Sequence, residues 1–180
     1  MPRDRGAYVG AGPTSPPEGQ LGHQGHILSG VTGAARTAEQ RKADTLARLE
    51  ADADVWAATA NAGRPHQVPL SLARDGRHVI PATPAASPTA RNAAASGEVR
   101  LSLGTSRDVT IIEAAAKVVP CAQAPDPVAQ CYATRTGWNP RQEDVPHVYL
   151  IATPPTMRAW NSLAEINGRT IMRHGQWTPP

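Results

Sequence analysis

The stretch 81–104, PATPAASPTARNAAASGEVRLSLG, constrains the fold more than any other part of the chain. It predicts a strand, a turn, a short helix over 87–96 and then another strand. Ser87 suits the N-cap, and Pro88 suits the first helical position, where a missing N–H costs nothing. Gly97 follows the helix, where a residue of positive φ is favoured. A short capped helix between two strands is therefore expected here.

Alternation of apolar and polar residues predicts the strands, because successive side chains of a strand point to opposite faces. The expected strands are 54–60, 65–73, 78–83, 98–103, 109–119 and 147–159. Pro69 removes a ladder donor and so favours a sheet edge or a bulge, and Pro154–Pro155 is expected to interrupt the last strand. Many antiparallel strands with few helices are typical of a small barrel.

Two helices and a tail complete this outline. Thr37 and Gln40 fit a capping box that opens a helix running to about residue 51. A second helix is expected over 126–135, and residues 160–177 are expected to form a C-terminal tail.

With aromatic residues at 4% and no Phe, the core must be built from Val, Leu, Ile and Ala.

Residues 1–36 differ in composition from the rest of the chain. They hold eight of the 15 glycines and few large apolar residues. Such a segment buries too little surface to offset its ordering entropy. The sequence therefore predicts a disordered Gly/Pro-rich extension over 1–36 and one domain over 37–177.

Charge and cysteine content exclude several classes of protein. The net charge is +3 and no run of Lys or Arg forms a stripe, so nucleic acid is not an expected partner, whereas a small anionic ligand is compatible. No apolar run has the length of a membrane span, and no apolar signal core opens the chain, so a cytoplasmic protein is expected. Cys121 and Cys131 fit no zinc pattern; reduced thiols are expected, with a facultative bridge between them as the alternative, and no metal is expected.

The start of the 87–96 helix is a candidate phosphate site. A helix N-terminus presents free N–H groups and the positive end of its dipole, and Ser87, Thr89 and Arg91 add two hydroxyls and a guanidinium. The alternative is a capped surface helix with a solvated arginine. His66 lies on a neighbouring strand, where a hydrogen-bonded structural role is the alternative to ligand binding. No side chain stands out as a general acid or base, which fits chemistry performed by a bound cofactor.

Several stretches together resemble actinobacterial members of the pyridoxamine 5′-phosphate oxidase-like flavin-binding split-barrel family. They are VWAATANAGRPHQVPLSL (55–72), HVIPATPAASPTARNAAASGEVRLSLG (78–104), VTIIEAAAKVV (109–119), YATRTGW (132–138) and RAWNSLAEINGRTIMRHGQW (158–177). The resemblance implies a mainly β (α+β) fold, a six-stranded antiparallel split β-barrel with flanking helices. It also implies a homodimer with FMN, or in some branches a deazaflavin, at the subunit interface.

The resemblance also implies a set of cofactor-binding residues. The flavin-contacting strand of the family often holds a basic residue at its start and another near its end, and His66 and Ser71 stand there. Hydroxyls and a cation for the phosphate correspond to Thr83, Ser87, Thr89 and Arg91, while Trp160 and Arg169 resemble residues that reach the partner's flavin. The complete implied set is His66, Val68, Pro69, Leu70, Ser71, Thr83, Ser87, Thr89, Arg91, Asn92, Trp160 and Arg169.

Three functions remain open on the sequence. The first is an FMN-dependent oxidoreductase acting on a small organic substrate, and the second is a deazaflavin-dependent reductase. The third is a module that binds a flavin or another flat cofactor without turnover. The substrate residues of pyridoxamine phosphate oxidases are not evident, and no catalytic residue is assigned.

Overall fold

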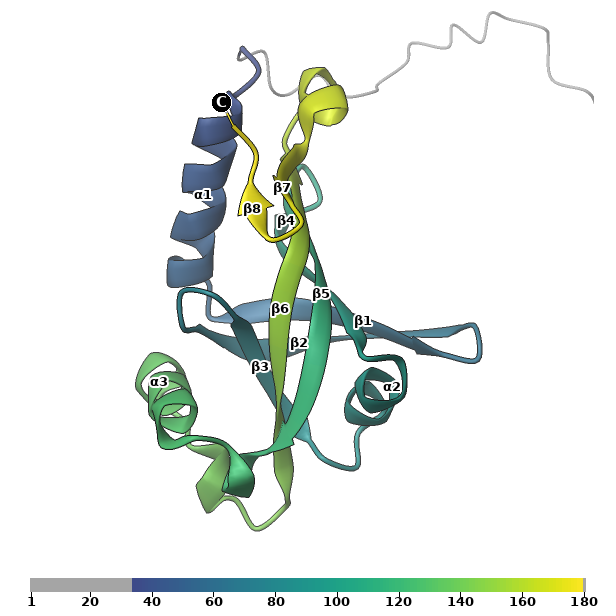
Figure 1. The fold of residues 1–180 in the computed structure, drawn as a ribbon, viewed down its shortest axis with the longest axis vertical. Helices are drawn as coiled ribbons and strands as arrows, with labels where there is room; N and C mark the ends of the chain where they lie inside the picture. The colour runs from purple at the N-terminus through teal and green to yellow at the C-terminus, as the bar shows by residue number, and fades with distance from the viewer. Residues whose placement is uncertain (1–33, 180) are drawn as a thin grey trace, which may run out of the picture. The chain divides into compact units, whose positions relative to one another are not determined.

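Six antiparallel strands close into a barrel in the structure, a computed structural model that describes residues 34–179 (Figure 1). The strands are β1 (Asp54–Asn61), β2 (Arg64–Arg74), β3 (Val79–Pro84), β4 (Glu98–Thr105), β5 (Asp108–Pro120) and β6 (His147–Trp160). Their order is β3-β2-β1-β4-β5-β6, and a further pairing of β3 with β6 closes the barrel. The predicted six-stranded antiparallel barrel is confirmed.

Strand β6 runs without a break through Pro154 and Pro155, so the predicted interruption is wrong. Glu113 of β5 pairs with Thr156 and Ala115 pairs with Thr153. The two prolines therefore oppose the single residue between these partners, which is a bulge. A bulge tolerates residues that lack an N–H, because the ladder is locally disrupted there.

The C-terminal residues are more ordered than the predicted tail. A 3₁₀ helix η3 (Leu163–Gly168) is followed by β7 (Thr170–Arg173), which pairs with β6, and by β8 (Gln176–Trp177). His174 and Gly175 join the two strands with positive φ angles of 51° and 73°. A two-residue turn of this kind suits a hairpin, but strands this short show no readable alternation.

Three α-helices flank the barrel (Figure 1): α1 (Ala38–Ala51), α2 (Pro88–Ser96) and α3 (Asp126–Thr136). The predicted Thr37–Gln40 capping box is present, and Ser87 and Gly97 cap α2 as predicted. Helix α1 packs on β7, α2 on β1 and α3 on β2. Two further 3₁₀ turns, η1 (Cys121–Gln123) and η2 (Pro140–Gln142), lie on either side of α3 in the sequence.

The core divides into an aliphatic barrel interior, an aromatic cluster beneath α3 and a small aliphatic cluster between α2 and β6. The interior is built mainly from Val, Leu, Ile and Ala, as predicted, with Met157 and Met172 added. The cluster contains the fully buried rings of Tyr132 and Tyr149, whose centroids lie 5.1 Å apart. Tyr132 also donates its hydroxyl to the Ser71 carbonyl at 3.1 Å, so α3 is fastened to β2.

The predicted boundary at residue 36 places Arg36 on the wrong side. Its backbone N–H donates to Glu165 Oε1 at 2.8 Å, and its guanidinium contacts both oxygens of the same carboxylate. Arg36 therefore belongs to the folded domain. The rest of the predicted extension up to residue 33 lies outside the described residues.

Candidate functional site at the start of helix α2

The N-terminus of α2 presents a group of hydrogen-bond donors. Ser87 Oγ accepts the Ala90 N–H at 3.0 Å and the Thr83 hydroxyl at 3.1 Å, which leaves its own O–H able to donate. Pro88 has no N–H, so Thr89 carries the first N–H of the helix, and that group has no acceptor within the helix. Thr89 is only 1% exposed, however, so of these two groups the half-buried Ser87 hydroxyl is the one open to an anion.

Arg91 adds a positive charge beside these donors. Its side chain is exposed, and its guanidinium donates to the Ala86 carbonyl in the turn that precedes the helix. One such bond leaves most of the five guanidinium N–H groups free. A hydroxyl and a guanidinium beside the positive end of a helix dipole are donors of the kind that bind a phosphate group.

Other predicted residues of α2 face the barrel. Thr89 is 1% exposed and its Oγ1 lies 3.1 Å from His66 Nε2 on β2. Asn92 is also buried and donates to Thr59 Oγ1 on β1 at 3.2 Å. These side chains fasten α2 to two strands, and their polar groups are engaged within the domain.

The predicted residues of β2 divide between its two faces. His66, Val68 and Leu70 share the inner face and are half-buried. On the outer face Pro69 is exposed and pairs with Trp56, while the Ser71 hydroxyl donates to Asp54 Oδ1 at 2.9 Å. A ligand lying flat on one face of β2 therefore contacts only some of these side chains.

The edge of β2 provides another route to a ligand. Strand β2 pairs with β1 from Arg64 to Ser71, whereas its pairing with β3 covers only Leu72 to Arg74. Within the described residues, 64–71 thus has no strand on its second side, which agrees with the edge predicted from Pro69. The segment also contacts α2, through the His66 side chain on its inner face.

Trp160 and Arg169 form a second group. The Arg169 guanidinium lies 5.6 Å from the centroid of the Trp160 ring, a cation–π contact. Trp160 ends β6 and Arg169 follows η3, where Leu163 is 69% exposed. The sequence resemblance paired these two residues, and the structure places them together.

The two groups lie far apart in one copy of the chain. Val148 of β6 shares a buried cluster with Ala90 of α2, and Trp160 lies at the other end of the same strand (Figure 1). Twelve residues of strand extend about 40 Å at 3.3 Å per residue, although the bulge shortens this. A single mononucleotide therefore cannot contact both groups of the same copy.

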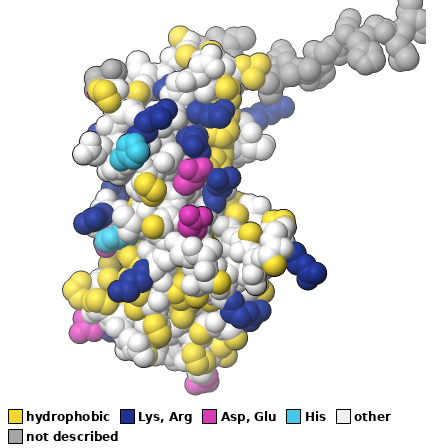
Figure 2. Space-filling view, turned by 45° about the vertical axis from the view of Figure 1, so that its right-hand side comes forward, with side chains coloured by type: hydrophobic (Ala, Val, Ile, Leu, Met, Phe, Trp, Pro, Cys, Tyr) yellow, Lys and Arg dark blue, Asp and Glu magenta, His cyan; other side chains and the backbone are white. Residues whose placement is uncertain are grey.

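The outer sheet face carries mixed charges. Arg158 and Arg100 both donate to Glu113 Oε1, at 2.6 and 3.0 Å. The hydrogen bond from Arg158, with the charges of both arginines, holds the pKa of Glu113 below its usual value against the effect of burial. Trp56 lies on the same face and is 49% exposed. Figure 2 shows basic side chains interspersed with acidic and apolar ones, without a continuous basic stripe on the face in view.

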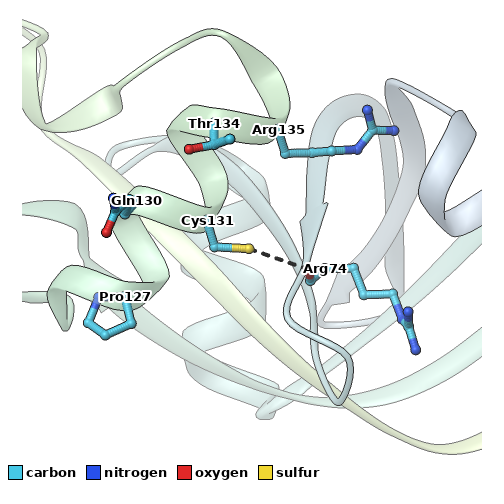
Figure 3. A pocket seen from close by; sticks show the side chains of 6 residues that line it. All are labelled: Arg74, Pro127, Gln130, Cys131, Thr134 and Arg135. Carbon is cyan, nitrogen blue, oxygen red and sulfur yellow. Dashed lines mark hydrogen bonds between the residues drawn. The ribbon is translucent and has the colours of Figure 1, made fainter.

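An open pocket lies between α3 and the end of β2, away from the predicted site (Figure 3). The Cys131 thiol donates to the Arg74 carbonyl at 3.4 Å. Burial raises the pKa of Cys131, and the charges of Asp75 and Glu50 raise it further. No sequence motif indicated this pocket, whose lining residues are Arg74, Pro127, Gln130, Cys131, Thr134 and Arg135.

Residues 34–179 contain neither a metal-binding cluster nor a membrane-spanning helix. In that part of the chain no three His, Cys, Asp or Glu side chains gather into a metal-binding group. Across the same residues, no helix combines the length and apolar character required to cross a membrane.

Comparison with known proteins identifies the fold. No protein-family model matches the chain, and no curated protein matches it. Among solved structures, a protein from Listeria innocua provisionally assigned as a pyridoxamine 5′-phosphate oxidase superposes with a TM-score of 0.56 at 15% identity, covering 67% of this chain and 98% of that one.

Two further solved structures are similar. One, from Clostridium acetobutylicum, is related to general stress protein 26 and attributed to the pyridoxinephosphate oxidase family; its TM-score is 0.52 at 12% identity, covering 69% of this chain and 91% of that one. The other is a conserved hypothetical protein from Mycobacterium tuberculosis, with a TM-score of 0.51 at 17% identity over 67% of this chain and 84% of that one. The domain therefore has the split-barrel fold of pyridoxamine 5′-phosphate oxidase-like proteins.

Proposed function

We propose that this protein is an FMN-binding oxidoreductase that acts on a small organic substrate. The observation that carries the proposal is the pair of donors at the start of α2, the Ser87 hydroxyl and the Arg91 guanidinium. These donors belong to a helix that contacts the unpaired segment of β2, in a fold also found in a protein attributed to the pyridoxinephosphate oxidase family. The phosphate of FMN would bind at α2 and its flat ring would lie along the free edge of that segment.

The residues of the chain have distinct roles in this proposal. Arg91 holds the phosphate by charge, while His66 and Asn92 fix the helix against the barrel. The backbone of the free β2 edge offers donors and acceptors to the polar rim of a ring system. The bound flavin would supply the capacity to take up a hydride, and the protein would supply binding and electrostatics.

The proposed functional unit is a homodimer. Because Trp160 and Arg169 lie too far from α2 to reach the same mononucleotide, they would act on the cofactor held by a second copy. Exposed Leu163 beside them and exposed Trp56 on the outer sheet face are large apolar side chains that such a contact would cover. Each site would then take α2 and β2 from one copy and the β6–η3 corner from the other.

The test is a titration of the purified chain with FMN, in which absorption and fluorescence report binding and give the Kd. Arg91→Ala should weaken FMN binding by about 10- to 100-fold, because a charge-assisted contact contributes about 1.5–3 kcal/mol. Arg107→Ala, which removes an exposed arginine from the β4–β5 turn, is the matched control and should leave the Kd unchanged. Riboflavin, which lacks the phosphate, should bind wild type more weakly than FMN and should lose less affinity in Arg91→Ala.

Two other outcomes would change the proposed phosphate site or the proposed cofactor. Equal FMN affinity of Arg91→Ala and wild type would remove the phosphate site from α2. Binding of a deazaflavin in place of FMN would favour the reductase alternative. Anaerobic reduction of the bound flavin by NADH or NADPH separates an enzyme from a module that only binds, since only an enzyme needs a reductant.

A further inference from the structure

The segment that joins Trp160 to Arg169 is held at both ends by buried charged side chains. At its start, the Asn161 N–H donates to Glu165 Oε2 at 2.8 Å, and the Glu165 side chain is 0% exposed. At its end, Arg41 of α1 donates to the Gly168 carbonyl at 2.6 Å and is only 6% exposed. The two held positions are the immediate neighbours of Trp160 and Arg169.

These two contacts belong to one network. Arg36 joins them, because its guanidinium and N–H bind Glu165 while its carbonyl accepts a hydrogen bond from Arg41. The network therefore runs from Asn161 through Glu165, Arg36 and Arg41 to Gly168. It closes a loop around the segment that carries the Trp160–Arg169 contact.

Stability alone does not account for the burial of Arg41 in this network. Arg41 is buried with two carbonyls as its hydrogen-bond acceptors, and its Nε has no partner in the described structure. Burying a guanidinium with an unsatisfied donor is unfavourable, and a buried ionic network is often no more stabilising than apolar packing. In some proteins a buried network of this kind specifies one conformation, and the segment that this network holds at both ends is 161–168.

We infer that Arg41 and Glu165 are positioning residues for the Trp160–Arg169 pair. They set the path of the segment between the two residues and thereby hold the guanidinium over the indole ring. This inference rests on the proposed function, in which that pair completes the cofactor site of a second copy. The conformational role itself does not require the cofactor and can be tested without it.

The test uses the full chain labelled with 5-fluorotryptophan and ¹⁹F NMR. The four tryptophans give separate resonances, and Trp160→Phe assigns the one of interest. In Glu165→Gln and in the milder Arg41→Lys, the Trp160 resonance should shift or broaden. Trp138, which packs beneath α3, should keep its resonance and serves as an internal reference.

Arg74→Gln is the matched control, because it breaks an Arg–Glu pair with Glu50 that touches neither Trp160 nor its segment. It should leave the Trp160 resonance unchanged. An unchanged Trp160 resonance in folded Arg41→Lys or Glu165→Gln would overturn the inference. If Glu165→Gln does not fold, Arg41→Lys alone decides, since it keeps the positive charge.

FMN titration of the same variants distinguishes this inference from the proposed function. If the inference and the proposed function are both correct, Arg41→Lys should weaken FMN binding by about tenfold. An effect of this size is typical of a residue that acts on a ligand through a neighbouring residue. Absence of FMN binding by wild type would refute the proposed function, while a shifted Trp160 resonance would still support the positioning role. Full FMN affinity in a variant with a displaced Trp160 resonance would remove that pair from the cofactor site.

Discussion

Removing the guanidinium of Arg36 should destabilise the domain in a way that depends on pH. Burial raises the pKa of Glu165, but hydrogen bonds from the Arg36 side chain, the Arg36 N–H and the Asn161 N–H outweigh burial and lower that pKa from 4.5 to about 2. At 1.36 kcal/mol per pKa unit this lowering corresponds to about 3 kcal/mol. Removal of one partner from a buried ion pair typically costs about 3–5 kcal/mol, so Arg36→Met should reduce the free energy of unfolding by about 3 kcal/mol.

The sign of the pH dependence follows from the direction of the pKa change. A carboxyl group with a lower pKa in the folded state stabilises the fold above its unfolded value, and this contribution is lost as the pH falls towards the folded pKa. For Glu165 the window runs from 4.5 down to about 2. In Arg36→Met the hydrogen bonds from the guanidinium are lost, so burial raises the pKa of Glu165. Protonation of Glu165 at low pH then removes the buried unpaired charge and restores part of the lost stability. The stability difference between wild type and variant should therefore narrow from pH 7 to pH 3.

The assay is urea denaturation at several pH values, with thermal melting at pH 7. A loss of about 3 kcal/mol lowers the Tm of a domain of this size by about 10 °C. Arg74→Met is the matched control, because its partner Glu50 is 63% exposed and such a pair contributes at most about 1 kcal/mol. The reasoning fails if Arg36→Met costs no more than Arg74→Met at pH 7, or if acid does not narrow its difference from wild type.

Three further predictions concern assembly, the domain boundary and the thiols. Light scattering should give a dimer for wild type. Trp56→Glu should shift the protein towards a monomer, since the variant places a charge in the contact between the two copies. A wild-type monomer with cofactor bound would contradict this prediction. A chain that begins at residue 34 should melt like the full chain, whereas one that begins at Thr37 should melt lower because it lacks Arg36. Burial raises the pKa of Cys121 to about 11, so iodoacetamide at pH 8 should leave Cys121 unmodified in the native protein, as judged by mass spectrometry, and modify it in urea.

Local chemistry explains why much of the fold could be predicted from the sequence. The ends of α2 follow from Ser87 and Gly97, because a cap depends on residues within one helical turn. The Thr37 capping box predicted α1 for the same reason. Alternation predicted the six barrel strands, since the side-chain period of a strand is visible in any half-buried segment.

The errors occurred where the outcome depends on a distant segment. Pro154 and Pro155 read as a break, but the partner strand β5 accommodates them by a register shift. The hairpin of β7 and β8 was taken as a tail, because strands of four and two residues carry too little pattern. Arg36 was placed in the extension, because its partner Glu165 lies 129 residues away.

In the candidate site, too, the sequence determined local features and the tertiary structure determined the rest. The sequence determined that hydroxyls, a helix start and Arg91 lie close together, since they fall within a few consecutive residues. Tertiary structure decided which of these groups face outward: Thr89 and Asn92 bond to β2 and β1, while Arg91 stays exposed. Tertiary structure alone also placed Trp160 at the opposite end of β6 from α2, because the distance between two groups is fixed by strand pairing and by the length of the strand that separates them.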